Sequence, residues 1–180
     1  MNNTLLTQDQ QAKIELAVKK LLTRNPARLN QWETLKKIVE QENIKVEEGE
    51  LKDISGMLLQ RAGKQWTIIV NRDDSQARKL FSIAHELGHY FLHRKEQQEF
   101  IDSDFVQNYW ERSENTKRQK IELEANQFAG SLIMPKTVIE EKLPGKMQKI
   151  EYDQASELAQ KFGVSVLAMI TRLKNLGYNA

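Results

Sequence analysis

The run His85-Glu86-Leu87-Gly88-His89 constrains this 180-residue chain more than any other feature. Residues four apart on an α-helix lie on the same face, so His85 and His89 can reach one ion. A catalytic zinc site has three protein ligands and keeps a fourth position open to water. Glu86 lies one residue round the helix, where it can take a proton from that water. The spacing supplies two metal ligands and a general base, and it requires a third ligand from elsewhere.

The residues around this run predict a helix from about Ser75 to His93. Apolar residues recur there at helical spacing and fill most of the helix surface; they are Leu80, Phe81, Ala84, Leu87, Gly88, Phe91 and Leu92. The remaining stripe holds Glu86 and all three histidines of the chain, the third being His93. A helical histidine is more often an ordinary surface or core residue, but this concentration on one stripe favours a metal site.

The composition predicts one soluble globular domain, with room for a small appendage. Hydrophobic residues make up 39% of the chain and charged residues 29%. No apolar run approaches the length of a membrane span, and the first residues lack the pattern of a signal peptide, so we expect a cytoplasmic protein without a membrane partner. Cysteine is absent, which excludes disulfides and thiolate-bound zinc. A net charge of +2 is too small to indicate nucleic-acid binding.

Periodicity predicts the remaining elements. We expect amphipathic helices at about 8–22 and 28–41, packed into the core, and then a strand-like stretch containing Ile44 and Val46. The runs 54–60 and 65–71 flank a glycine-containing turn, which indicates a hairpin. The polar stretch 94–119 reads as a long loop with at most a short helix, either a lid or a solvated insertion. A helix at about 118–134 ends before Pro135, and a helix pair within 156–177 breaks near Gly163.

Carboxylates are the expected source of the third ligand. His93 fits that role poorly, because no glycine bends the chain between His89 and His93, so a supporting or packing role is favoured. The candidates are Glu122 and Glu124 on the predicted helix, and Asp102, Asp104 and Glu114 in the loop. A helix holds a ligand more rigidly than a loop does. Glu122 and Glu124 lie at opposite borders of the apolar face, and periodicity alone does not choose between them.

Two longer runs of the sequence resemble the same known family. Residues 81–93 resemble the active-site helix of the ImmA/IrrE-type metallopeptidases, and residues 122–135, with the sequence ELEANQFAGSLIMP, resemble the helix that supplies their glutamate ligand. The strand 68–71 and the ending 162–177 are similar too, so the resemblance covers most of the chain from Ile54 onward. The chain departs from the family at Gly130-Ser131, where alanine and a helix-favouring residue are usual, and the stretch between the two motifs is somewhat long.

The resemblance implies a small zinc peptidase of the gluzincin kind. It assigns Zn²⁺, one per chain, to His85, His89 and Glu124, with Glu86 as the catalytic base. Two imidazoles and a carboxylate also admit Mn²⁺, iron or cobalt. The expected fold is α+β and mainly helical, with a small twisted antiparallel or mixed sheet packed on the active-site helix. A peptidase domain at 1–148 (N-terminal helices at 1–50, sheet and site helices at 51–135) would precede a C-terminal helical extension at 149–180.

The same resemblance implies a protein substrate. The best-known members cleave a helix-turn-helix repressor and so switch on mobile-element, phage or stress genes. Three residues are unranked candidates for stabilising the transition state: Tyr90, His93 and Tyr109. We also expect an edge strand near Trp66–Val70 to hold an extended substrate, and Asn126 to be structural rather than close to the metal.

Two other classes of function remain open. A DNA- or protein-binding regulator is suggested by the helix-turn-helix spacing of the tail, but acidic and basic residues are equally numerous in 151–180, whereas a DNA-reading helix normally carries a basic excess. We therefore expect no direct nucleic-acid binding. A metal-containing scaffold that acts on a repressor without proteolysis is the second alternative, because intact ligands do not guarantee a productive cleft.

Overall fold

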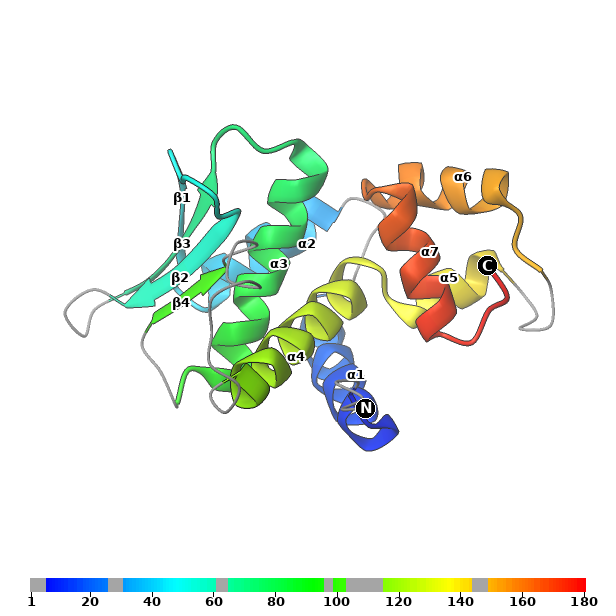
Figure 1. The fold of residues 1–180 in the computed structure, drawn as a ribbon, viewed down its shortest axis with the longest axis horizontal. Coiled ribbons are helices and arrows are strands. Elements are labelled where there is room, and N and C mark those ends of the chain that lie inside the picture. The colour runs from blue at the N-terminus through cyan, green and yellow to red at the C-terminus, as the bar shows by residue number, and fades with distance from the viewer. Residues whose placement is uncertain (1–5, 26–30, 61–64, 96–98, 103–114, 144–148) are drawn as a thin grey trace.

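The computed structural model describes residues 6–25, 31–60, 65–95, 99–102, 115–143 and 149–180. Helices predominate and a small sheet covers one side, so the predicted α+β class is confirmed (Figure 1). In chain order the elements are α1 (Gln8–Arg24), α2 (Gln31–Gln41), β1 (Lys45–Gly49), β2 (Gly56–Gln60), β3 (Trp66–Asn71), α3 (Gln76–His93), β4 (Glu99–Asp102), α4 (Asn115–Ile133), α5 (Lys136–Lys142), α6 (Tyr152–Phe162) and α7 (Val166–Asn175).

The sheet is mixed and has the strand order β1-β3-β2-β4. The predicted hairpin is confirmed, since β2 and β3 pair antiparallel with Leu58 opposite Ile68; its turn lies outside the described residues. β1 runs parallel to β3 on the other side. β3 is therefore an internal strand, and the expectation that Trp66–Val70 forms a substrate-binding edge is wrong. The edges of the described sheet are β1 and β4.

Two elements differ from the sequence prediction. The stretch expected to be loop contains β4, which pairs with β2, and α4 begins at Asn115, a few residues earlier than expected. Pro135 ends α4 as predicted but also precedes the first turn of α5, a helix that periodicity did not indicate. Proline is compatible with a helix start because its missing N–H would have no partner there.

α3 is the central element, packed between the sheet and α4 (Figure 1). Ser75 is its N-cap, and the Ser75 hydroxyl accepts a hydrogen bond from the Arg78 backbone N–H at 3.3 Å. α3 and α4 approach closely at Gly88, where a Cβ atom would lie 3.0 Å from the Cα of Ala125. A larger residue at position 88 would push the two helices apart by a few tenths of an ångström. Gly88 therefore favours the close approach, which brings the side chains on the borders of α4 within reach of the histidines on α3.

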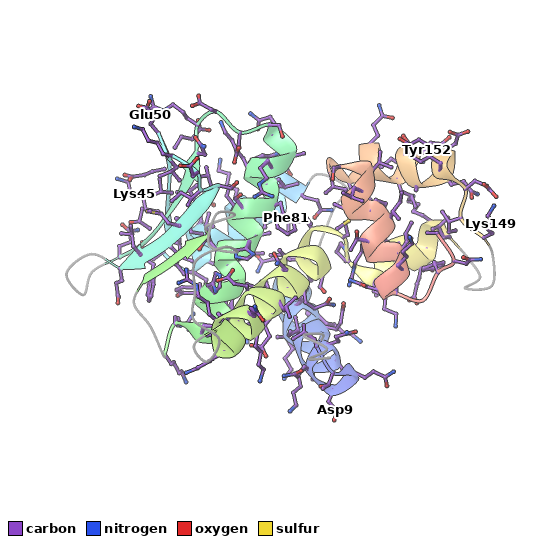
Figure 2. The ribbon with its side chains drawn as sticks, viewed as in Figure 1. Asp9, Lys45, Glu50, Phe81, Lys149 and Tyr152 are labelled. Atoms are coloured by element: carbon purple, nitrogen blue, oxygen red, sulfur yellow. The ribbon has the colours of Figure 1, made fainter. Side chains whose placement is uncertain are left out.

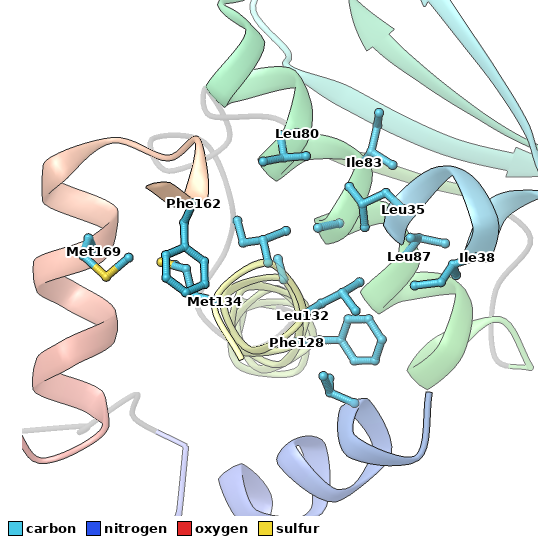
Figure 3. Packing of buried hydrophobic residues seen from close by; sticks show 14 of the residues in the cluster. Leu35, Ile38, Leu80, Ile83, Leu87, Phe128, Leu132, Met134, Phe162 and Met169 are labelled. Carbon is cyan, nitrogen blue, oxygen red and sulfur yellow. The ribbon is translucent and has the colours of Figure 1, made fainter. Parts of the chain in front are cut away.

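The core surrounds this helix pair. Figure 3 shows α4 nearly end-on, with α3 and α2 on one side and α7 on the other. Its labelled apolar side chains are almost fully buried: Leu35, Ile38, Leu80, Ile83, Leu87, Phe128, Leu132, Met134, Phe162 and Met169. Burying a large apolar side chain of this kind contributes about 1.5–3 kcal/mol. The backbone around the histidines is therefore held by packing on several sides.

The C-terminal helix pair joins the same core. α6 ends at Gly163, whose φ of 66° suits glycine, and α7 begins after the N-cap Ser165, so the predicted break is confirmed. Arg172 of α7 is buried and donates from Nε to the carbonyl oxygen of Met134 at 3.0 Å. Its Nη1 contacts Glu15 Oε1 on α1 at 2.6 Å. Among the described residues, no helix is both long and apolar enough to span a membrane.

Candidate metal centre

α3 brings His85 and His89 together on one buried stripe. They lie one helical turn apart, and their Nε2 atoms are 3.0 Å from each other. Both side chains are almost completely buried. This is the arrangement that the spacing of the motif predicts.

α4 adds a carboxylate to the pair. Glu122 Oε2 lies 3.1 Å from His85 Nε2 and 3.5 Å from His89 Nε2. The three ligand atoms fall within 4.8 Å of one another. Three atoms bound tetrahedrally at about 2.0–2.2 Å from zinc would lie roughly 3.3–3.5 Å apart. The separations and the donor types, two imidazoles and a carboxylate, therefore fit a divalent ion such as zinc.

Glu124 does not join this cluster, which corrects the assignment taken from the family resemblance. Its Oε2 lies 3.0 Å from His93 Nε2 instead. Two positions along a helix are about 200° apart, so neighbouring carboxylates at 122 and 124 leave opposite borders of the face that packs on α3. Glu122, on one border, lies next to His85 and His89, and Glu124, on the other border, lies next to His93.

Asn126 contacts the metal cluster, contrary to the expectation that it would be only structural. Its side-chain oxygen lies 2.9 Å from His85 Nδ1. An amide oxygen can only accept, so His85 donates from Nδ1, and its Nε2 is the nitrogen that faces Glu122. Asn126 lies one turn after Glu122, so both side chains reach the same histidine. That spacing of four was the sequence signal that could have found it.

The protonation states also suit a metal. Burial lowers the pKa of His89 to about 4, so its imidazole is neutral near pH 7, the form that binds metals. Burial raises the pKa of Glu122, but hydrogen bonds and charge interactions with His85 and His89 outweigh it and bring the pKa well below the usual range. A neutral imidazole and an ionised carboxylate are what a metal ion requires of its ligands.

Glu86, the predicted base, is fully buried beside the first residue of β2. A Cβ atom built on Gly56 would lie 3.2 Å from Glu86 Oε1. The carboxylate therefore occupies the space that a glycine leaves open at the start of the strand. Its catalytic role stays a prediction.

Three comparisons with known proteins address the family. Residues 39–174 match the model of a peptidase family described as the IrrE N-terminal-like domain. The chain belongs to this family. The predicted resemblance to ImmA/IrrE-type metallopeptidases is thereby confirmed.

Two individual proteins resemble the chain at low sequence identity. The chain is 28% identical to the metallopeptidase ImmA of Bacillus subtilis (strain 168) over 137 residues, which cover 76% of this chain and 72% of ImmA. A solved Mycobacterium tuberculosis transcriptional regulator superimposes with a TM-score of 0.63 at 18% identity, over 92% of this chain. The chain spans about half of that regulator, 48% of its length, and at this identity the likeness concerns the fold alone.

In this member of the IrrE N-terminal-like family, the side chains of Tyr90 and His93, two of the three candidate transition-state residues, make their contacts away from the three ligand atoms. The Tyr90 hydroxyl donates to Glu42 Oε2 at 3.0 Å, and burial raises its pKa. The guanidinium of Arg94 covers the Tyr90 ring at 4.0 Å. His93 is buried between His89 and Glu124 rather than facing the cleft. Tyr109 and the loop carboxylates Asp104 and Glu114 lie outside the described residues, as does the side chain of Asp102.

A cavity of about 670 Å³ opens at the metal cluster of this family member. One wall comes from α3 and α4 and includes Phe81, which Figure 2 places on the side of α3 that faces the C-terminal helices. α7 supplies the opposite wall with Leu167, Thr171 and Asn175. This wall could not be predicted from the sequence, because nothing in the periodicity of the tail shows which earlier element it faces.

Proposed function

We propose that the chain is a zinc-dependent endopeptidase whose metal is held by His85, His89 and Glu122. The observation that carries the proposal is the convergence of two Nε2 atoms and one carboxylate oxygen at 3.0–3.5 Å, at the mouth of a cleft. Membership of a peptidase family and similarity to a protein named metallopeptidase ImmA support it.

Each residue of the site has a separate role in the proposed mechanism. Bound zinc supplies a Lewis acid that polarises a peptide carbonyl and lowers the pKa of water toward about 7. Asn126 holds His85 with its Nε2 lone pair toward the site. Glu86 accepts a proton from the attacking water and passes it to the leaving amine. Buried walls around Glu86 and His89 exclude bulk water, which strengthens charge interactions within the site.

The substrate is proposed to be a protein, and more narrowly a helix-turn-helix repressor. The cleft of about 670 Å³ is lined by His85 and Glu122, so a peptide bound in it would lie beside two of the proposed ligands. The choice of a repressor rests on the resemblance to the ImmA/IrrE type. Cleavage of such a repressor would relieve repression of mobile-element, phage or stress genes.

Metal content measured by elemental analysis tests the site directly. The wild type, Glu122→Ala and Glu124→Ala are purified without chelator and loaded with zinc. We expect about one zinc per chain in the wild type and loss of tightly held zinc in Glu122→Ala, whereas Glu124→Ala should still bind the ion at saturating zinc, although more weakly than the wild type. A wild type that holds no zinc after loading would overturn the proposal, and loss only in Glu124→Ala would reassign the ligand.

A further inference from the structure

We propose that His93 and Glu124 form a two-step hydrogen-bonded relay that fixes the tautomer and orientation of His89. The inference rests on the proposed zinc site, since His89 is one of its ligands. It concerns residues behind the site, neither of which supplies one of the three ligand atoms. His93 and Glu124 are therefore positioning residues that act through His89.

The relay is defined by two contacts. His89 Nδ1 lies 3.3 Å from His93 Nδ1, and His93 Nε2 lies 3.0 Å from Glu124 Oε2. The three side chains come from two helices, since His89 and His93 lie one turn apart on α3 and Glu124 lies on α4. A line of polar atoms therefore runs from His89, away from the metal cluster, to a carboxylate at the border of α4.

The hydrogens along this line can be assigned from the acceptor at its end. An ionised carboxylate only accepts, so His93 must carry its proton on Nε2. A neutral His93 then has an accepting lone pair on Nδ1, and His89 must donate to it from its own Nδ1. The Nε2 of His89, which lies next to His85 Nε2 and Glu122 Oε2, is then the nitrogen that can bind a metal. This is the tautomer that binds a metal through Nε2.

Burial protects the hydrogen bonds of the relay from competition by water. The side chain of His89 is inaccessible to solvent and that of His93 is 4% exposed, while that of Glu124 is 20% exposed. Water can therefore compete little for the two histidine contacts, and hydrogen bonds in such surroundings are strong. Glu124 Oε1 faces Lys120 Nζ at 3.9 Å, at the outer end of the line. The relay thus connects a ligand in the interior to a carboxylate near the surface.

The relay mirrors the contact on the other ligand. Asn126 sets the tautomer of His85 directly, with one hydrogen bond from α4. His93 and Glu124 do the same for His89 in two steps, because a second histidine separates His89 from α4. Both ligand histidines are thereby fixed by residues of the helix that also supplies Glu122.

The test uses four substitutions. His93→Phe removes both ring nitrogens at similar volume, and Glu124→Ala removes the terminal acceptor. Glu124→Gln keeps a carbonyl acceptor without the charge, and His93→Asn keeps an acceptor near the Nδ1 position. The control is Glu157→Ala, which removes an exposed carboxylate on α6, far along the chain from the site. Thermal unfolding of each variant shows that it is folded.

Two readouts are measured. Long-range ¹⁵N–¹H NMR of the metal-free protein reports which nitrogen of each imidazole is protonated, and with three histidines in the chain the spectrum is simple to assign. Zinc affinity is measured by competition with a chromophoric chelator. We expect His89 to be protonated on Nδ1 in the wild type, and zinc affinity to fall about 10–100-fold in His93→Phe and Glu124→Ala. Glu124→Gln and His93→Asn should lie closer to the wild type, and Glu157→Ala should match it.

The relay is overturned if His89 of the metal-free wild type carries its proton on Nε2. It is also overturned if His93→Phe and Glu124→Ala fold, bind zinc within about twofold of the wild type and leave the His89 signals unchanged. Failure of the proposed function looks different: the wild type itself would bind no zinc. In that event the NMR spectrum still decides the relay, because the tautomer is read without metal.

Discussion

At the scale of single residues, the side chains of the site differ in the contacts that they make. His85, His89 and Glu122 contact one another, and Asn126 contacts the nitrogen of His85 that faces away from this cluster. Glu86 points instead toward the start of β2. Substitutions at these positions should therefore have different signatures in metal binding and in cleavage.

Glu86→Gln should retain zinc but lose cleavage. The amide cannot accept the proton of the attacking water, and general-base catalysis typically contributes about 10²–10⁴-fold, so the rate should fall by about that factor. Cleavage of a repressor is followed on gels beside a zinc assay of the same preparation. Undiminished cleavage by this variant would contradict the mechanism. Repressor binding without cleavage by the wild type would favour a scaffold.

Asn126→Ala should weaken zinc binding about 10–100-fold, because His85 loses the acceptor that orients it. Asn126→Asp is the matched control, since a carboxylate oxygen can accept from the same Nδ1–H, and it should bind zinc far better than the alanine variant. Affinities come from chelator competition. Equal affinities for Asn126→Ala and the wild type would show that the ring of His85 is held by packing alone.

The grouping of His85 and His89 could be predicted from spacing, because one helix carries both and its period is fixed. The role of Glu86 as a base stays a prediction. The choice between Glu122 and Glu124 could not be predicted, since it depends on how α4 crosses α3. The family resemblance favoured Glu124, whereas the structure places Glu122 at the cluster. Asn126 was missed for the same reason, as its partner lies on another helix.

At the scale of elements, the contact between α3 and α4 decides whether the ligands meet. Gly88 lies against the backbone of Ala125, with the Phe128 Cβ also close. Gly130, on α4, has open space where a Cβ atom would be placed. The two glycines therefore provide a matched pair for substitution: Gly88 lies where α3 and α4 approach closely, whereas Gly130 does not.

Gly88→Ala should destabilise the fold by about 1–3 kcal/mol, because the added methyl group meets backbone that cannot move freely. It should also weaken zinc binding, since α4 carries Glu122. Gly130→Ala should instead raise stability by about 0.5–1 kcal/mol by reducing the backbone entropy of the unfolded chain. Chemical denaturation gives both values. An unchanged Gly88→Ala variant would show that the helices can separate without cost.

At the scale of the whole molecule, Glu15, Ser131 and Arg172 join three helices. The Ser131 hydroxyl donates to Glu15 Oε1 at 2.7 Å, and Arg172 contacts the same oxygen. Burial raises the pKa of Glu15, but the hydrogen bond and charge of Arg172, together with Ser131 and Lys136, lower it below its ordinary value of 4.5. This network holds α7 as one wall of the cleft.

The network predicts a pH dependence of stability. Because the folded-state pKa of Glu15 is below its unfolded value, its stabilisation is fully present above about pH 4.5 and is lost as the pH falls through the folded-state pKa. Glu15→Gln should unfold at a lower temperature than the wild type at neutral pH, and the two curves should converge on acidification. Calorimetric scans at several pH values measure this. A constant difference across that range would exclude the ion pair as the cause.

Long helices, the hairpin and the helix break at Gly163 could be predicted because each leaves a local signature. β4 and α5 could not: β4 is a short strand in a polar stretch, and α5 follows a proline that indicated a stop. The internal position of β3 depends on its parallel pairing with β1, which no local pattern encodes. The boundary predicted at residue 148 stays a prediction.

The ion pair between Glu15 and Arg172 also has a consequence for biosynthesis. The metal ligands leave the ribosome well before α7, which forms the far wall of the cleft and contacts α1 through Arg172. A nascent chain can therefore bring His85, His89 and Glu122 together while the cleft still lacks one wall. We expect the cleft to be completed only after α7 is synthesised and Arg172 docks onto α1.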